Sequence, residues 1–384
     1  MRRPMYKSIR SLLVLIVIAP SMAWAQKKEA PAPCPSDINV TPNLSEVASL
    51  AKLSTLSELS NLSGLPELAK LGDMEMHLSQ TAPAGEAASA LDSEKRKTFE
   101  KTYKVSNADL LSIENKFGKV HVNTWNKNEV KVKVDIIARC STEDKAQELL
   151  DKISVVERRD SKMIALRTNI EPMRVSNNSN KSFEINYTVY MPEENSIAVK
   201  NSFGDVYLAA LKGKADISVK YGALKTDRLN NNSNNVTIAY GSGNCGYING
   251  GNVNVAYSSM NVGSTNGLQG SSKFSDFKIG DLNQELNLEL KYGTFKVDRV
   301  SKDIRRISLD SGFSPILLNF ADNSAFNFDV NVQFADFKVD KSLVNITSLE
   351  KDYTSAEYKG KFGGTSPKGL ISISSKYGDV KFTK

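Results

Sequence analysis

Apolar and polar residues alternate along most of the chain after about residue 94. Alternation with a period of two predicts β-strands that bury one face. Many of these stretches end in an aromatic residue, as in Ile217-Ser-Val-Lys-Tyr221 and Val253-Asn-Val-Ala-Tyr257. A small residue, usually Gly or Ser, then follows, and the alternation resumes in a new phase. Two strands joined at a bend are therefore predicted, because Gly adopts backbone angles that are closed to residues with a Cβ.

This unit recurs at a nearly constant interval. The aromatics that end the strands are 18, 19, 17, 17 and 18 residues apart: Phe203, Tyr221, Tyr240, Tyr257, Phe274 and Tyr292. A fixed short period is typical of stacked repeat folds. We therefore predict an all-β fold, a single-chain β-solenoid (β-helix) with coils of 17–19 residues. Neighbouring coils would lie about 4.8 Å apart, and like residues would form columns along the stack.

Two such columns follow from the alternation. The aromatic is in phase with the apolar residues two and four positions before it, which predicts an internal aromatic stack. A lysine often stands four residues beyond the aromatic, out of phase with the apolar positions, and is predicted to point outward. These lysines are Lys225, Lys278, Lys296, Lys338 and Lys381.

The pattern is less regular toward both ends of the repeat region. Ser311-Gly312 occupies the motif position without an aromatic, Phe334 restores the motif, and Tyr377 follows only 43 residues later. Longer loops are therefore predicted between the last coils. An earlier copy begins at Phe117, and the long alternating stretches that follow it predict wider strands at the N-terminal end of the same solenoid.

One helix is predicted within this region, over residues 141–153. Ser141 suits an N-cap, acidic residues fill the first turn, and the apolar side chains form one stripe. The stripe consists of Ala146, Leu149, Leu150 and Ile153. A solenoid has open ends that expose unpaired strand edges, so we expect this short helix to cap the stack. A binding helix is the alternative.

Residues 1–25 have the features of a secretory signal peptide. Four basic residues precede the apolar run of residues 12–19, and Ala23-Trp-Ala25 matches the small-x-small cleavage pattern. No later stretch is long and apolar enough for a transmembrane helix. The mature protein is therefore predicted to be exported, and to reside in the periplasm, at the outer membrane surface or outside the cell. Removal of the signal lowers the formal net charge from +7 to +3.

Residues 26–93 differ from the rest of the chain. Leucines, with Val47 as the one exception, recur at every third position between residues 44 and 71. On an α-helix that spacing spirals around the axis, and Gly64 and Pro66 interrupt it, so two short helices are predicted. Such helices need a partner, and residues 41–78 are expected to contact the solenoid, another copy or a membrane surface. A mobile stalk is the alternative, and Ala-rich residues 81–90 read as a linker to the domain at residues 94–384.

The ionisable residues argue against several functions. The small, dispersed net charge gives no support for nucleic-acid binding. Cys34, Cys140 and Cys245 are too scattered for a metal cluster or a disulfide framework. The chain has only two histidines, His77 and His121, and none of the common hydrolase or nucleotide-binding motifs. No catalytic, cofactor-binding or metal-ligating residue is therefore assigned, and the ligand-binding residues stay open.

A carbohydrate-active enzyme is the main enzymatic alternative, because some β-solenoids cleave polysaccharides with clustered acids and Ca²⁺. Four acids share the position two residues after the aromatic: Asp205, Asp276, Asp336 and Asp379. Because they fall on separated coils, we expect them to lie about 10 Å or more apart, too far to share one ion. Bonds to nearby backbone at the bends are the preferred interpretation.

The opening of the repeat region resembles a known family. Ser112-Ile-Glu-Asn-Lys-Phe-Gly-Lys-Val-His-Val-Asn-Thr-Trp, then Val130-Lys-Val-Lys-Val and serial Tyr-Gly or Phe-Gly units, resemble the bacterial putative-adhesin domain family over residues 98–384. The resemblance implies an exported cell-envelope β-solenoid and brings no catalytic residues. The predicted function is a non-enzymatic adhesion or interaction module that binds an envelope or surface protein or a glycan. A periplasmic sensor or scaffold that recruits a partner through the Leu-rich segment is a further alternative.

Overall fold

The computed structural model describes residues 93–172, 181–364 and 367–384. These residues are almost entirely β, and their strands join into one continuous sheet of 25 strands. The predicted signal peptide, Leu-rich segment and linker lie outside the described residues. No described helix is long and apolar enough to cross a membrane.

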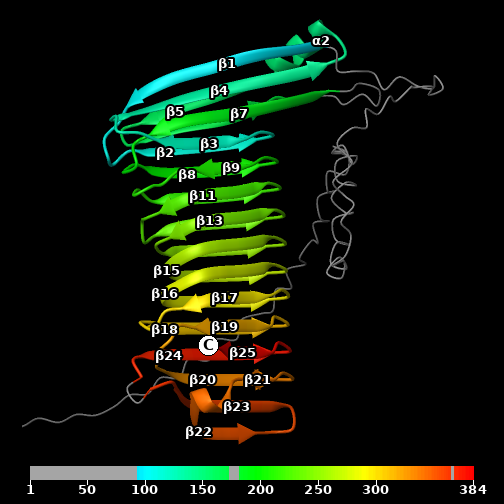
Figure 1. Ribbon diagram of the computed structural model, residues 1–384. Helices are drawn as coiled ribbons and strands as arrows, with labels where there is room; N and C mark the ends of the chain where they lie inside the picture. The colour runs from blue at the N-terminus through cyan, green and yellow to red at the C-terminus, as the bar shows by residue number, and fades with distance from the viewer. Residues whose placement is uncertain (1–92, 173–180, 365–366) are drawn as a thin grey trace, which may run out of the picture. The chain divides into compact units, whose positions relative to one another are not determined.

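The middle of the described chain is a series of coils, each made of two strands joined at an aromatic bend (Figure 1). Strands before the bend are β8 (Ser196–Ser202), β10 (Ala215–Lys220), β12 (Asn234–Ala239), β14 (Gly251–Ala256) and β18 (Arg306–Gly312). Strands after it are β9 (Val206–Leu208), β11 (Ala223–Leu229), β13 (Ser242–Ile248), β17 (Phe295–Val300) and β19 (Ile316–Phe320). The longer β15 (Ser259–Lys273) and β16 (Asp276–Lys291) contribute to two successive coils each.

Each strand pairs in parallel with the equivalent strand of the next coil. Ile217 lies opposite Val236, and Val236 lies opposite Val253. The apolar member of each alternation is buried, so that columns of Ile, Val and Leu fill the space between the two strands of a coil. Parallel pairing satisfies the backbone groups of each coil through its neighbours.

The N-terminal end of the sheet has longer strands, as predicted, but many of them pair antiparallel. β1 (Ser93–Lys104), β4 (Glu129–Cys140) and β7 (Ser182–Met191) form one antiparallel set, and β5 (Ile153–Asp160) pairs antiparallel with β6 (Met163–Ile170). β2 (Leu110–Lys116) lies between β6 and β8, and β3 (Val120–Thr124) lies between β7 and β9. The coil of Phe117 is therefore inserted between segments that follow it in the sequence.

Helix α2 (Glu143–Asp151) packs against β1 and β4 at this end (Figure 1). Its N-cap is Thr142, whose hydroxyl accepts the Lys145 N–H, and not Ser141 as predicted. Ala146 and two leucines are buried beneath it, whereas Ile153 already belongs to β5. The helix covers an end of the sheet, as a capping element should.

The C-terminal coils are not arranged in chain order. The elements are β20 (Phe326–Gln333), β21 (Phe337–Lys338), the 3₁₀ helix η3 (Lys341–Leu343), β22 (Val344–Lys351), β23 (Ser355–Phe362), β24 (Gly369–Lys376) and β25 (Val380–Thr383). β24 lies between β18 and β20, and β25 lies between β19 and β21. The prediction of long loops between these coils is wrong, because η3 and the antiparallel pair β22–β23 fill most of the interval between Phe334 and Tyr377.

Both ends of the sheet carry features that discourage further strand pairing. Among the described strands, β1 pairs only with β4, and β22 pairs only with β23. β1 has the strongly charged sequence SEKRKTFEKTYK, and the pairing of β22 is interrupted between Ile346 and Ser348. Charges and bulges at an edge oppose the addition of another strand.

Candidate functional site

The aromatic column lies on the outside of the coils, so the predicted internal stack is wrong. Its ten members all have positive φ, between 51° and 60°. They are Phe117, Phe203, Tyr221, Tyr240, Tyr257, Phe274, Tyr292, Phe313, Phe334 and Tyr377. From Phe203 onward, these side chains are 43–51% exposed. The two-residue alternation of side chains requires extended backbone, and a residue in the left-handed region breaks it. Each ring therefore faces outward, although alternation along the sequence predicts that it faces the core.

The structure also adds one bend that the sequence pattern missed. Phe313 has φ 56° and is followed by Ser314, so the motif copy is Phe313-Ser and not Ser311-Gly312. Ser311 is buried, and its hydroxyl donates to the Ser314 carbonyl at 2.7 Å. Ser375 makes the equivalent bond to Gly378. A polar residue two positions before the aromatic thus satisfies a carbonyl inside the bend.

The ten rings form one continuous ladder along the described coils. Neighbouring ring centroids are 4.6–5.1 Å apart, with planes within 14° of parallel. At the N-terminal end, Phe183 meets Phe117 edge-on at 5.3 Å. Because the rings cover one another's faces, the ladder presents mainly ring edges to solvent. It therefore offers no row of open ring faces on which a sugar could stack.

The predicted outward lysine row is confirmed. All five lysines are exposed, and Lys278 and Lys296 both bind the Asp298 carboxylate, at 2.7 and 2.9 Å. Hydrogen bonds from these two lysines lower the pKa of Asp298. Lys338 pairs with Asp379 at 2.5 Å. Exposed pairs of this kind typically contribute less than about 1 kcal/mol each.

Three of the four corner acids accept a backbone N–H at the bends. Asp205 accepts the Ala223 N–H at 2.9 Å, and Asp276 accepts the Thr294 N–H at 3.1 Å. Asp379 accepts the N–H of Asp336 at 3.0 Å. Asp336 and Asp379 lie on adjacent coils, because β25 is inserted beside β21. The predicted separation of about 10 Å or more is therefore wrong for this pair.

Other candidate chemical groups are dispersed. His121 lies on the exposed face of β3, and its ring meets Tyr207 edge-on at 4.5 Å. Cys140 and Cys245 are both buried free thiols, while Cys34 and His77 fall outside the described residues. Within the described ranges, no group of three or more His, Cys, Asp or Glu side chains is placed to hold a metal ion.

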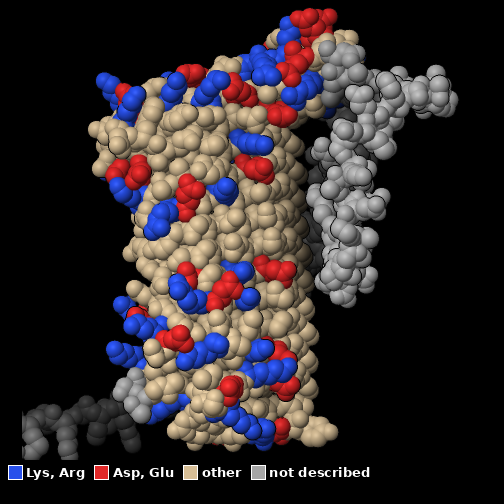
Figure 2. Space-filling model, viewed as in Figure 1, with Lys and Arg blue, Asp and Glu red and all other residues tan. Residues whose placement is uncertain are grey.

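A different feature distinguishes the middle coils, namely a complete lack of charge. Residues 229–272 contain no Asp, Glu, Lys, Arg or His and are rich in Asn, Ser and Gly. They run from the end of β11 through most of β15 and occupy adjoining coils. Figure 2 shows a band without charged side chains between two charged regions of the face drawn. We call residues 229–272 the neutral belt; its signal in the sequence is compositional, an absence of charged residues, which catalytic motifs do not reveal.

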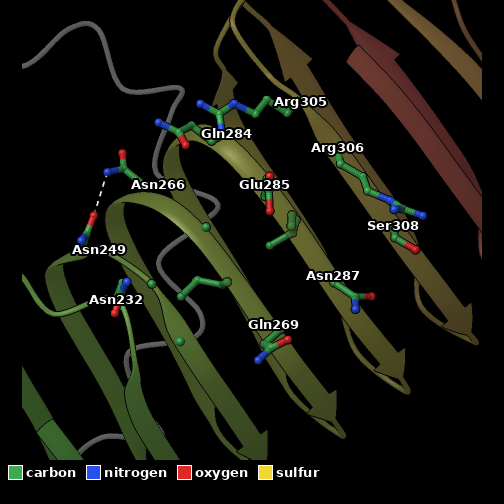
Figure 3. A pocket seen from close by; sticks show the side chains of 15 residues that line it. Asn232, Asn249, Asn266, Gln269, Gln284, Glu285, Asn287, Arg305, Arg306 and Ser308 are labelled. Atoms are coloured by element: carbon green, nitrogen blue, oxygen red, sulfur yellow. Dashed lines mark hydrogen bonds between the residues drawn. The ribbon is translucent and has the colours of Figure 1, made fainter. Parts of the chain in front are cut away.

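A groove opens at the side of the coils opposite the aromatic bends, partly within the neutral belt. There, the chain turns between coils over residues 230–233, then over only Asn249-Gly250, and later over residues 301–305. The short glycine-containing turns form a saddle between the two longer ones, with Asn232 on one side and Arg305 on the other (Figure 3). The groove has a volume of about 670 Å³. Its walls are Asn232, Asn249–Gly251, Asn266–Gln269, Gln284–Asn287, Arg305, Arg306 and Ser308.

Amide side chains line the groove in two rows. In the turn row, Asn266 donates to Asn249 Oδ1 at 2.8 Å, and Asn283 donates to Asn266 Oδ1 at 3.2 Å. In the strand row, Gln269 lies opposite Asn287 on the neighbouring coil. The amides of Gln269, Gln284 and Asn287 make no hydrogen bond with another described residue. Figure 3 places these side chains, with Glu285 and Arg306, around the same opening.

Charge is confined to one part of the groove. Glu285 lies opposite Arg306 in the parallel pairing of β16 and β18, and Arg305 precedes Arg306. These three residues belong to coils beyond the neutral belt. One acid and two arginines give this part of the groove a formal charge of +1, and its remaining polar lining is uncharged.

Comparisons with known proteins give distant likenesses. No protein-family model matches the chain, and no curated protein does. The crystal structure of a putative adhesin from Bacteroides fragilis is 13% identical, with 74% of this chain and 97% of that chain covered and a TM-score of 0.37. A putative adhesin from Parabacteroides distasonis is 9% identical, with 74% and 97% covered and a TM-score of 0.33. A putative lipid binding protein from the same species is 12% identical, with 75% and 97% covered and a TM-score of 0.26. Likenesses at these values do not by themselves assign a fold or a function to the chain.

Proposed function

We propose that this chain is an exported, non-enzymatic interaction module of a bacterial cell envelope, built as a β-solenoid over residues 94–384. The regular parallel pairing with 17–19-residue offsets in the middle coils supports the solenoid. The signal-like residues 1–25 support export. Residues 41–78 would supply a second contact, with a membrane surface or another copy.

The observation that carries this proposal is the groove beside the neutral belt. Elsewhere the outer faces of the coils carry lysines and acids, several of which pair with each other. Contact with the neutral belt has a low desolvation cost, because the belt has no charge that must be buried. An envelope or surface protein or a glycan is the partner class that this surface fits.

Adding a charge to the neutral belt tests whether the belt binds envelope partners. Fluorescently labelled mature protein would be measured for retention on immobilised envelope proteins and glycans, with circular dichroism as the folding control. Asn252→Asp adds a nearly isosteric charge to the exposed belt face, and we expect it to reduce retention. Asn331→Asp adds the same charge to β20, outside the belt, and should leave retention unchanged. Equal retention of both variants would refute the role of the belt.

The non-enzymatic part of the proposal has its own test. Envelope and host glycans incubated with the protein, with and without Ca²⁺, should yield no new reducing ends and no unsaturated products. Turnover that disappears in Asp336→Asn or Asp379→Asn would overturn this part, since these two corner acids lie on adjacent coils.

A further inference from the structure

The groove contains hydrogen-bonding groups that the fold leaves unused. Gln269, Gln284 and Asn287 each carry an amide that can donate and accept, and none of the three bonds to another described side chain or backbone group. The turn-row amides Asn249 and Asn266, in contrast, are ordered by bonds to each other. A fixed row of amides therefore lies beside a row that is free to bind a ligand.

The two rows run along the stack. Gln269 lies opposite Asn287, and Asn287 lies opposite Ser308, so the strand row places one polar group on each of three successive coils. Successive groups are about 4.8 Å apart, the ordinary distance between paired strands. A ligand with a repeating set of polar groups would meet an equivalent contact on every coil.

The chemistry of the lining selects the class of ligand. The groove leucines, Leu268 and Leu286, are buried at 4% and 2% exposure, so they offer no apolar anchor of the kind that dominates most peptide interfaces. Glu285 opposes Arg306, and Arg305 leaves a single excess positive charge at the turn, outside the strand row of Gln269 and Asn287. Neutral amides without an anchor match a ligand that is itself dense in hydroxyl groups.

We propose that this groove binds an uncharged glycan chain, running across the coils between Asn232 and Arg305. This inference rests on the proposed interaction function and specifies its ligand. Gln269 and Asn287 contact the hydroxyl groups directly, whereas Asn249 and Asn266 form the rigid wall. The aromatic ladder lies at the opposite bend and takes no part.

Titration calorimetry with soluble oligosaccharides tests the inference on the full mature protein. Uncharged hexose oligomers of increasing length are compared with acidic oligosaccharides and with an uncharged polar peptide. We expect binding of at least one uncharged series, with affinity that rises with length up to the span of the groove. Gln269→Ala and Asn287→Ala should each weaken that binding about 2- to 12-fold, the range for one lost hydrogen bond.

Asn331→Ala on β20 is the matched control, because it removes an exposed amide from the outer face of a strand outside the groove. It should leave the dissociation constant unchanged. Preference for acidic oligosaccharides or for the peptide would overturn the ligand assignment, as would equal affinity of all three variants. Light scattering that shows dimers lost in Asn287→Ala would identify a second copy as the occupant and also overturn it. If no oligosaccharide binds while Asn252→Asp still reduces retention on envelope partners, the ligand class fails and the interaction function stands.

Discussion

At the residue scale, each bend depends on an aromatic in the left-handed region followed by a small residue. Tyr292 has φ 54°, and a Cβ placed on Gly293 would lie 1.9 Å from the Ser275 carbonyl oxygen of the neighbouring coil. Ser275 is itself a small residue, and its hydroxyl donates to the backbone at 2.7 Å. Close approach between coils therefore limits the position after the aromatic to small side chains.

Substitution of this glycine should be costly. Gly293→Ala forces the two coils apart, and we expect it to lower the free energy of unfolding by about 1–3 kcal/mol, the usual range for overpacking. Gly312→Ala is the matched control, since its Cβ would meet nothing nearer than 4.0 Å. Urea denaturation of both variants measures the difference. A similar loss at the two sites would contradict the steric explanation.

The buried Tyr187 is expected to lower the free energy of unfolding as the pH becomes alkaline. The Tyr187 hydroxyl lies 2.9 Å from Thr168 Oγ1, and burial raises the pKa of Tyr187 to about 12 from its ordinary value of 10.0. Its folded-state pKa exceeds the unfolded one, so the stabilisation is complete below about pH 10 and is lost as the pH rises toward about 12. The slope for one proton is about 1.4 kcal/mol per pH unit.

Tyr187→Phe should therefore show a shallower decline in unfolding free energy over this pH range. A residual decline is expected from Tyr103, whose pKa burial also raises. Denaturant titrations at several alkaline pH values compare the two chains. Identical slopes would show that Tyr187 ionises without unfolding.

At the element scale, the aromatic ladder links each bend to the next. Tyr240 stacks on two neighbours, with centroids 5.0 and 5.1 Å away, whereas Phe334 has one stacked neighbour, Tyr377, at 4.9 Å. A stacked pair contributes about 0.5–1.5 kcal/mol beyond area burial. The ladder therefore adds stability from outside the core, although its rings are half exposed.

The loss of unfolding free energy on removing one ring should increase with the number of rings stacked on it. We expect Tyr240→Ala to cost about 1–3 kcal/mol and Phe334→Ala about half as much, in denaturant unfolding. Tyr240→Gly should recover part of the loss, because glycine adopts positive φ freely. Lys225→Ala on the outward row is the control and should change little. Equal losses at Tyr240 and Phe334 would argue that the rings stabilise the bends individually, without stacking.

At the scale of the whole described sheet, the last coil is inserted between two earlier ones. Ile373 of β24 lies opposite Leu309 of β18 on one side and opposite Val330 of β20 on the other, and all three side chains are buried. β24 thus connects the middle coils to the C-terminal elements β20–β23. This end of the sheet cannot assemble completely until the last residues of the chain are available.

Loss of packing in β24 should loosen both neighbours. Ile373→Ala is expected to cost about 2–5 kcal/mol, as for other buried aliphatic truncations, and to make the turn at residues 321–325 sensitive to limited proteolysis. Leu370→Ala on the same strand, where the side chain is 43% exposed, should have little effect. Unchanged protease resistance in Ile373→Ala would show that β20–β23 hold together without the inserted coil.

The sequence predicts part of the candidate site at the groove, but not all of it. The lack of charge over residues 229–272 and the repeated Asn at the turns are visible in the chain itself. The saddle between turns of unequal length, and the position of Gln269 beside Asn287, depend on which coils are neighbours. Composition could therefore indicate an uncharged surface, but not the opening within it.

The sequence by itself determined the strands, the length of the middle coils and the outward lysines, because a period of two and a spacing of 17–19 residues are local properties of the chain. Tertiary structure decided the rest. Tyr221 and its equivalents face solvent, because a left-handed residue reverses the expected side, and alternation does not encode φ. β2–β3 and β24–β25 are inserted out of chain order, because strand partners are selected by pairing and burial between segments distant in sequence.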